Sequence, residues 1–108
     1  MDRFPPDAAE YAKEVELPPR KQRGWVHEVE VPMREGENLE YATAHDGEGD
    51  RVAFNIHSHE GGETSYYVQS SKARTAGSFS SPSDGNFYLM WENVSGAPVR
   101  VQVRATRR

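Results

Sequence analysis

The sequence lacks cysteine, long apolar segments and any strong excess of one charge. With no cysteine among its 108 residues, the chain forms no disulfide, offers no thiolate metal site and has no cysteine nucleophile. No apolar run approaches the ~20 residues that span a bilayer, and no signal peptide is recognisable after Met1. We therefore expect a cytoplasmic protein or, if a membrane anchor has been removed, a soluble piece from the periplasmic side of the cell envelope.

The charge balance and the missing motifs exclude several classes of function. The net charge of −4, from 13 basic and 17 acidic residues, gives no general attraction for nucleic acid or for anionic membranes. No serine lies in a Gly-x-Ser-x-Gly elbow. Gly61-Gly62 is followed by neither the lysine nor the helix of a phosphate-binding loop. The sequence thus favours a protein without catalytic residues and without a nucleic-acid partner.

What the chain does contain, from residue 25 onward, is short runs in which apolar and polar residues alternate. This period of two is typical of strands with one buried face. The expected inward-facing residues are His27, Val29, Val31, Leu39, Tyr41, Thr43, Val52, Phe54, Ile56, Phe79, Phe87, Leu89, Trp91, Val99, Val101 and Val103. Asp46-Gly47 favours a hairpin turn, and residues 85–103 are expected to form the last hairpin. The pattern predicts an all-β fold, an antiparallel β-sandwich of about seven to eight strands of jelly-roll type.

Residues 1–24 differ from the rest of the chain. They hold four of the seven prolines, which are Pro5, Pro6, Pro18 and Pro19. Asp7 stands before a run of good helix formers that ends at Glu14, and this predicts one or two helical turns. We expect residues 1–24 to be an arm or linker outside the core and residues 25–108 to form the β-sandwich domain.

Four stretches resemble a known family. They are VAFNIHSH at 52–59, GSFSSPSDG at 77–85, YLMWENVS at 88–95 and PVRV at 98–101. Their order resembles that of GOLD-type (Golgi-dynamics) β-sandwiches, in particular bacterial GOLD-like domains of small membrane-anchored proteins. The resemblance implies a non-enzymatic protein-binding module at a membrane complex or the cell envelope. The disulfide, coiled coil and membrane span of the eukaryotic members are absent from this sequence, so their role in cargo trafficking does not carry over.

The run His57-Ser58-His59-Glu60-Gly61-Gly62-Glu63 is the candidate metal site. Residues two apart on a strand share a face, so His57 and His59 lie side by side. With Glu63 returning from the turn, they could ligate a divalent transition metal such as Zn²⁺, Cu²⁺, Ni²⁺ or Fe²⁺. The spacing resembles the His-x-His-x3-Glu motif of cupins, but Tyr88 stands where the second cupin motif has histidine. The simpler interpretation is two polar surface histidines at the end of a strand.

The tyrosines are candidates for partner binding. Tyr66 and Tyr67 are adjacent and face opposite ways, whereas Tyr88 and Met90 share the polar face of their strand. We expect Tyr67, Tyr88 and Met90 to contact a protein partner. A neighbouring loop or the N-terminal arm covering Tyr88 and Met90 is an equally good explanation.

The sequence therefore predicts a non-enzymatic interaction module without a cofactor. The alternative is a small metal-binding protein that uses His57, His59 and Glu63. A carbohydrate-binding module built on Tyr66, Tyr67 or Tyr88 is a third hypothesis.

Overall fold

A computed structural model describes residues 1–47 and 49–108 of the chain. These ranges contain nine strands and no helix. The strands are β1 (Asp2–Arg3), β2 (Glu10–Leu17), β3 (Val26–Met33), β4 (Asn38–His45), β5 (Val52–Glu60), β6 (Glu63–Ser70), β7 (Arg74–Ser80), β8 (Gly85–Asn93) and β9 (Val99–Arg107). In the described ranges, nothing helical is long and apolar enough to cross a membrane.

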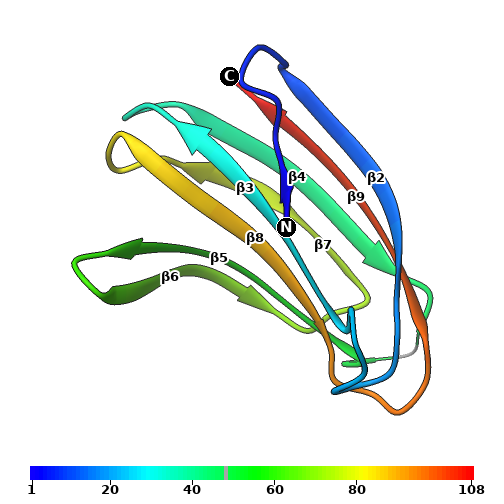
Figure 1. Cartoon of the computed structure of the whole chain (residues 1–108). Coiled ribbons are helices and arrows are strands. Elements are labelled where there is room, and N and C mark those ends of the chain that lie inside the picture. Colours follow the sequence, from blue (N-terminus) through cyan, green and yellow to red (C-terminus); the bar gives the residue numbers. More distant parts are fainter. Residues whose placement is uncertain (48) are drawn as a thin grey trace.

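The strands form two stacked sheets (Figure 1). One sheet has five strands in the order β1-β3-β8-β5-β6, and the other has four in the order β2-β9-β4-β7. Neighbouring strands are antiparallel except for β1 and β3, which are parallel. The predicted all-β sandwich is confirmed, and its strands number nine because residues 1–24 supply β1 and β2.

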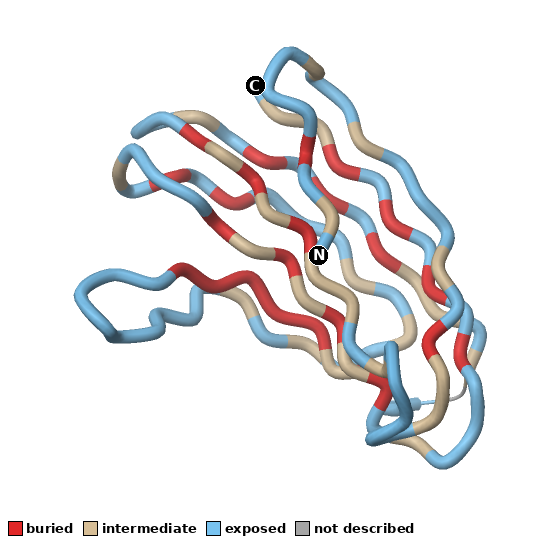
Figure 2. Tube along the Cα trace, viewed as in Figure 1, coloured by how far each residue is buried: buried red, intermediate tan, exposed pale blue. Residues whose placement is uncertain are grey.

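The core lies between the sheets, where alternate residues of β3, β4, β8 and β9 are buried (Figure 2). The buried hydrophobic residues include Val29, Val31, Leu39, Tyr41, Val52, Phe54, Ile56, Phe79, Phe87, Leu89, Trp91, Val99, Val101 and Val103. Trp91 is fully buried in this layer, and its indole Nε1 donates a hydrogen bond of 2.8 Å to Thr43 Oγ1 in the opposite sheet. The inward faces expected from the alternation are therefore correct, because apolar side chains two residues apart must share the buried side of a strand.

The expected helical turns between Asp7 and Glu14 are wrong. Residues Glu10–Leu17 form β2, which pairs with β9 along its whole length. Tertiary pairing overrides the helix propensity of Ala12, Lys13 and Glu14. The segment also contributes to the core, because Phe4 and Leu17 are fully buried. The division of the chain at residue 24 stays a prediction.

Two expected hairpins are also wrong. The turns after β4 and after β8 lead from one sheet to the other, so neither β4 and β5 nor β8 and β9 pair. Asn93 holds the second of these connections. Its Nδ2 donates to the carbonyl oxygens of Leu17, Pro18 and Ala97 at 2.8–3.1 Å, and its Oδ1 accepts from the Ser95 backbone N–H at 2.9 Å. This fully buried amide joins the β2–β3 and β8–β9 connections.

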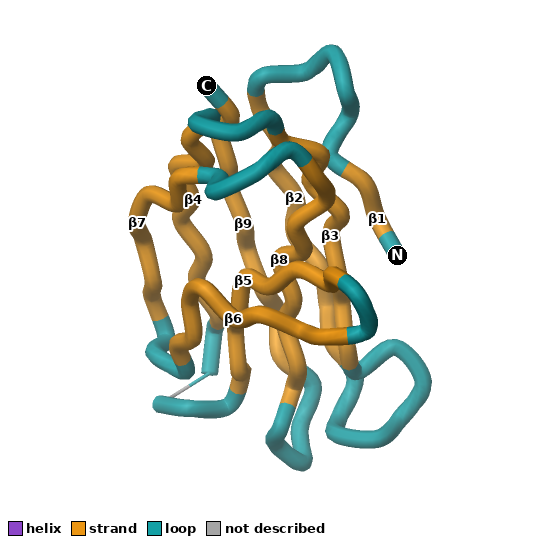
Figure 3. The backbone as a smooth tube through the Cα atoms, turned by 90° about the vertical axis from the view of Figure 1, so that its left-hand side faces the viewer, coloured by secondary structure: helices purple, strands orange, loops and turns teal. Residues whose placement is uncertain are grey.

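The connecting loops gather at the two ends of the strands (Figure 3). Among residues 1–47 and 49–108, no element covers the outer face of either sheet, and the two faces differ in chemistry.

Candidate functional site

His57 lies on the outer face of the five-stranded sheet, as the alternation predicts, yet only 3% of its surface is exposed. Tyr88 is directly opposite on β8, and the two rings stack at 5.4 Å with an interplanar angle of 20°. Tyr66 is opposite on β6, with its ring centroid 5.8 Å from that of His57. The two tyrosines therefore enclose the imidazole on the solvent side of the sheet.

The polar contacts of His57 define its protonation chemistry. Its Nδ1 donates to Asn55 Oδ1 at 2.6 Å, and its Nε2 faces Glu28 Oε2 at 3.4 Å. Burial lowers the pKa of His57, and the nearby Glu28 opposes this effect. The ion pair with Glu28 exists only when the imidazole is cationic, with Nε2 protonated as well as Nδ1. Burial disfavours this charged form.

The metal ligands predicted from the sequence are only partly brought together. The rings of His57 and His59 lie 4.9 Å apart, so their side-by-side placement is confirmed. His59 is exposed, and its Nδ1 lies 3.1 Å from Thr64 Oγ1. Glu63 is exposed, and it is the strand partner of Glu60 across the β5–β6 turn. In residues 1–47 and 49–108, no group of three or more histidine, aspartate and glutamate side chains is arranged to hold a metal ion. The assignment of His57, His59 and Glu63 to a metal stays a prediction.

The other two histidines lie away from this cluster. His27 is on the inner side of β3, stacked on Trp91 at 5.8 Å, and His45 ends β4 in the other sheet. Their Nε2 atoms are buried without a hydrogen-bond partner among the described residues. Burial lowers the pKa of both histidines. His45 is not brought to His57, because β4 and β5 belong to different sheets.

The predicted partner-binding residues fall on two sides of the sheet. Tyr88 and Met90 are half-buried on the outer face, where the Tyr88 hydroxyl donates to Glu30 Oε2 at 3.3 Å. Burial raises the pKa of Tyr88, and the adjacent Glu30 raises it further by a smaller amount. Tyr67 lies at an irregularity in the β5–β6 register and packs against Phe79 and Phe87, with its hydroxyl 2.8 Å from Ser58 Oγ. Tyr66, which is 54% exposed, is the aromatic residue beside His57 instead.

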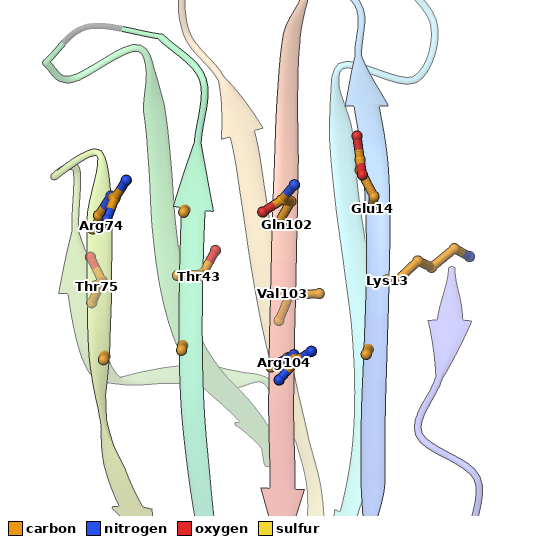
Figure 4. A pocket seen from close by; sticks show the side chains of 12 residues that line it. Lys13, Glu14, Thr43, Arg74, Thr75, Gln102, Val103 and Arg104 are labelled. Atoms are coloured by element: carbon orange, nitrogen blue, oxygen red, sulfur yellow. The ribbon is translucent and has the colours of Figure 1, made fainter.

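A second surface, on the outer face of the four-stranded sheet, was not foreseen from the sequence. It is a shallow groove of about 870 Å³ that crosses β2, β9, β4 and β7 (Figure 4). Its floor follows two rows of residues that the strand register aligns. These are Ala12, Arg104, Ala42 and Ala76 in one row, and Glu14, Gln102, Ala44 and Arg74 in the next. We call this surface the alanine groove.

The alanine groove exists because four of these eight outward-facing side chains are a single methyl group. The signal in the sequence is the alternation of Ala42 and Ala44 with the buried Tyr41 and Thr43. That signal gains meaning only when pairing places Ala12 and Ala76 in line with Ala42. Because residues 1–24 were expected to lie outside the sheet, the sequence could not show this alignment.

No family model matches the sequence, and no curated protein matches it. Among solved structures, the fold is similar to PliG, a periplasmic inhibitor of g-type lysozyme, from Aeromonas hydrophila. The TM-score is 0.69 at 9% identity, over 99% of this chain and 95% of that one.

Two further PliG structures are similar. The protein from Salmonella Typhimurium gives a TM-score of 0.60 at 8% identity, over 100% and 99% of the two chains. A mutant of the Escherichia coli protein gives 0.59 at 9%, over the full length of both chains. Identities this low show a shared fold and nothing finer.

The expected membership of the GOLD-like family is therefore wrong, and the fold is that of the PliG structures. The motifs behind that expectation have roles that any sandwich requires. Phe54, Phe79 and Trp91 fill the core, and Asn93 closes a connection between the sheets. Such residues recur wherever strands pack face to face, so they indicate the architecture without distinguishing one family of sandwiches from another.

Proposed function

We propose that this protein is a non-enzymatic protein-binding module that inhibits a lysozyme of the g type, and that it acts at the periplasmic side of the cell envelope. One observation supports this most directly. The similarity to three inhibitor structures extends over 95–100% of both chains, so the fold is shared along nearly the whole aligned length.

The surface of the protein is compatible with protein binding. Both sheets present broad outer faces that no other described element covers, and one of them contains the alanine groove.

The direct test is an inhibition assay. Lysis of a bacterial cell-wall suspension by purified g-type lysozyme would be followed by turbidity while the protein is added from substoichiometric to tenfold excess. We expect residual activity to fall in proportion to the added protein until the two are equimolar, as for a tight one-to-one complex. A c-type lysozyme in parallel should keep its activity. Unchanged g-type activity at tenfold excess would overturn the proposal.

A further inference from the structure

We propose that the alanine groove is the docking surface of this protein and that it binds a convex, acidic segment of the partner. The proposal rests on the proposed inhibitor function for the identity of the partner. It rests on the structure for the place and the chemistry.

Alanine at four clustered, solvent-facing strand positions needs a physical reason. Alanine is depleted in strands, where branched and aromatic side chains cover the sheet better. Here Ala12, Ala42 and Ala76 lie on three strands of one sheet, and Ala44 adjoins them in the next row. Small side chains at these positions lower the surface, so a protruding element of a partner can approach the sheet closely.

The size of the groove fits a protein segment. Four strands spaced ~4.8 Å apart give a floor about 14 Å wide, and an α-helix with its side chains is about 10–12 Å across. One helix or one broad loop would therefore fill the groove. A flat partner surface would leave its floor empty.

The charges of the groove set the chemistry of that segment. Glu14 pairs with Arg100 at 3.1 Å. Lys13 points away, toward β1, where its Nζ lies 2.8 Å from Asp2 Oδ2 (Figure 4). Arg74 and Arg104 have no ion pair within the described ranges, and both are exposed. The uncompensated charge of the groove is therefore positive, although the protein as a whole is acidic.

Arginine is well suited to a carboxylate, because its planar guanidinium donates two parallel hydrogen bonds to the two oxygens. Arg104 and Arg74 are two strands apart and one row apart, which places their Cα atoms roughly 12 Å from one another. A partner segment with two aspartate or glutamate side chains at a similar separation would pair with both. The alanines between the two arginines would contact the backbone or small side chains of that segment.

The experiment compares two charge-reversal variants of equal net charge. R74E/R104E changes the groove, whereas R20E/R23E changes two exposed arginines in the β2–β3 connection. Binding to g-type lysozyme would be measured by biolayer interferometry, with circular dichroism to verify folding of each variant. We expect R74E/R104E to bind roughly tenfold or more weakly and R20E/R23E to bind within about twofold of the original protein. A third variant, A42Q, fills the floor without a change of charge and should also weaken binding.

The outcomes separate this inference from the proposed function. If the protein binds the lysozyme and R74E/R104E binds equally well, the docking surface is elsewhere and this inference is overturned while the inhibitor function stands. If the protein does not bind the lysozyme at all, the inhibitor function fails, and poly-L-glutamate becomes the probe of the groove. Amide shifts in ¹H–¹⁵N spectra at Ala12, Ala42, Ala44 and Ala76 that disappear in R74E/R104E would then support the groove. Shifts elsewhere, or none, would overturn it.

Discussion

The guanidinium of Arg107 lies over the ring of Phe4, 4.6 Å from its centroid, and so joins the end of β9 to the N-terminal segment. Arg107 also donates hydrogen bonds of 2.8–3.1 Å to the carbonyl oxygens of Pro5, Pro6, Ala8 and Pro32. One side chain thus satisfies three backbone acceptors in residues 5–8, where proline has removed backbone donors, and a fourth at Pro32 in β3.

Removing this side chain should destabilise the protein. We expect Arg107→Ala to lower the free energy of unfolding by about 2–3 kcal/mol, because charged hydrogen bonds and a cation–π contact are lost together. Urea denaturation would measure it. The matched control is Arg104→Ala, an exposed arginine on the same strand, which should change stability by no more than about 0.5 kcal/mol. Equal effects of the two substitutions would contradict this role of Arg107.

Asn93 should be intolerant of substitution. Asn93→Ala removes the donor shared by three carbonyl oxygens, of which that of Leu17 is buried and the other two are part-buried, and we expect a loss of about 2–4 kcal/mol. Asn93→Asp is the more informative change, because a carboxylate would face those same oxygens. Its pKa should rise in the folded state, so Asn93→Asp should become more stable as the pH falls toward 4, unlike the original protein. Denaturation of both variants and of the exposed Asn86→Ala, expected near neutral, would check this.

The stability of the protein should fall as the pH is lowered through the range in which histidine titrates. Burial lowers the pKa values of His27, His45 and His57 below the ordinary value near 6.5. The unfolded chain therefore binds protons more readily than the folded one. The part of the stability that depends on neutral histidines is complete above pH 6.5 and decreases below it. Each histidine contributes up to about 1.4 kcal/mol per pH unit in that window.

Urea denaturation between pH 8 and pH 5 would measure this slope, and His27→Phe should reduce it by removing one of the three titrating groups. A second loss should follow at lower pH. A hydrogen bond from Lys13, followed by one from Tyr11, lowers the pKa of Asp2 to about 2. The stabilisation from this lowered pKa is complete at pH values above the ordinary pKa of aspartate, and it is lost as the pH falls toward 2. A free energy of unfolding that is constant from pH 8 to pH 5 would contradict the burial of the three histidines.

Metal binding at His57 and His59 should be weak. The described part of the chain brings no third ligand to the two imidazoles, which alone leave a transition metal largely water-bound, and Nδ1 of His57 is already hydrogen-bonded to Asn55. We expect protein purified without a histidine tag and dialysed to carry far less than one equivalent of zinc by mass spectrometry of the metal. A stoichiometric metal content that His57→Ala/His59→Ala abolishes would instead establish the site predicted from the sequence.

The positions of most strands could be predicted because period-two alternation follows directly from strand geometry. Val99, Val101 and Val103 had to share a buried face whatever their partners were. The alternation gives no information about which strand pairs with which. Asp46-Gly47 therefore suggested a hairpin where the chain in fact passes from β4 to β5 in the other sheet.

The candidate sites show the same limit. The shared face of His57 and His59 was predictable from their spacing, but the burial of His57 depends on Tyr66 and Tyr88, which come from two other strands. The irregularity in the β5–β6 register exchanged the expected places of Tyr66 and Tyr67. The alanine groove was out of reach, since it requires β2 in a segment whose composition favours a helix.

The position of β9 has a consequence for how the chain folds during synthesis. β9 lies between β2 and β4 and hydrogen-bonds to both, yet it is the ninth strand to be made. The four-stranded sheet cannot close, and the alanine groove cannot form, until residues 99–107 have left the ribosome. Until then β2 and β4 lack the strand that hydrogen-bonds to both, and their apolar side chains are not yet held in one sheet. A nascent chain in that state is the kind of species that chaperones protect.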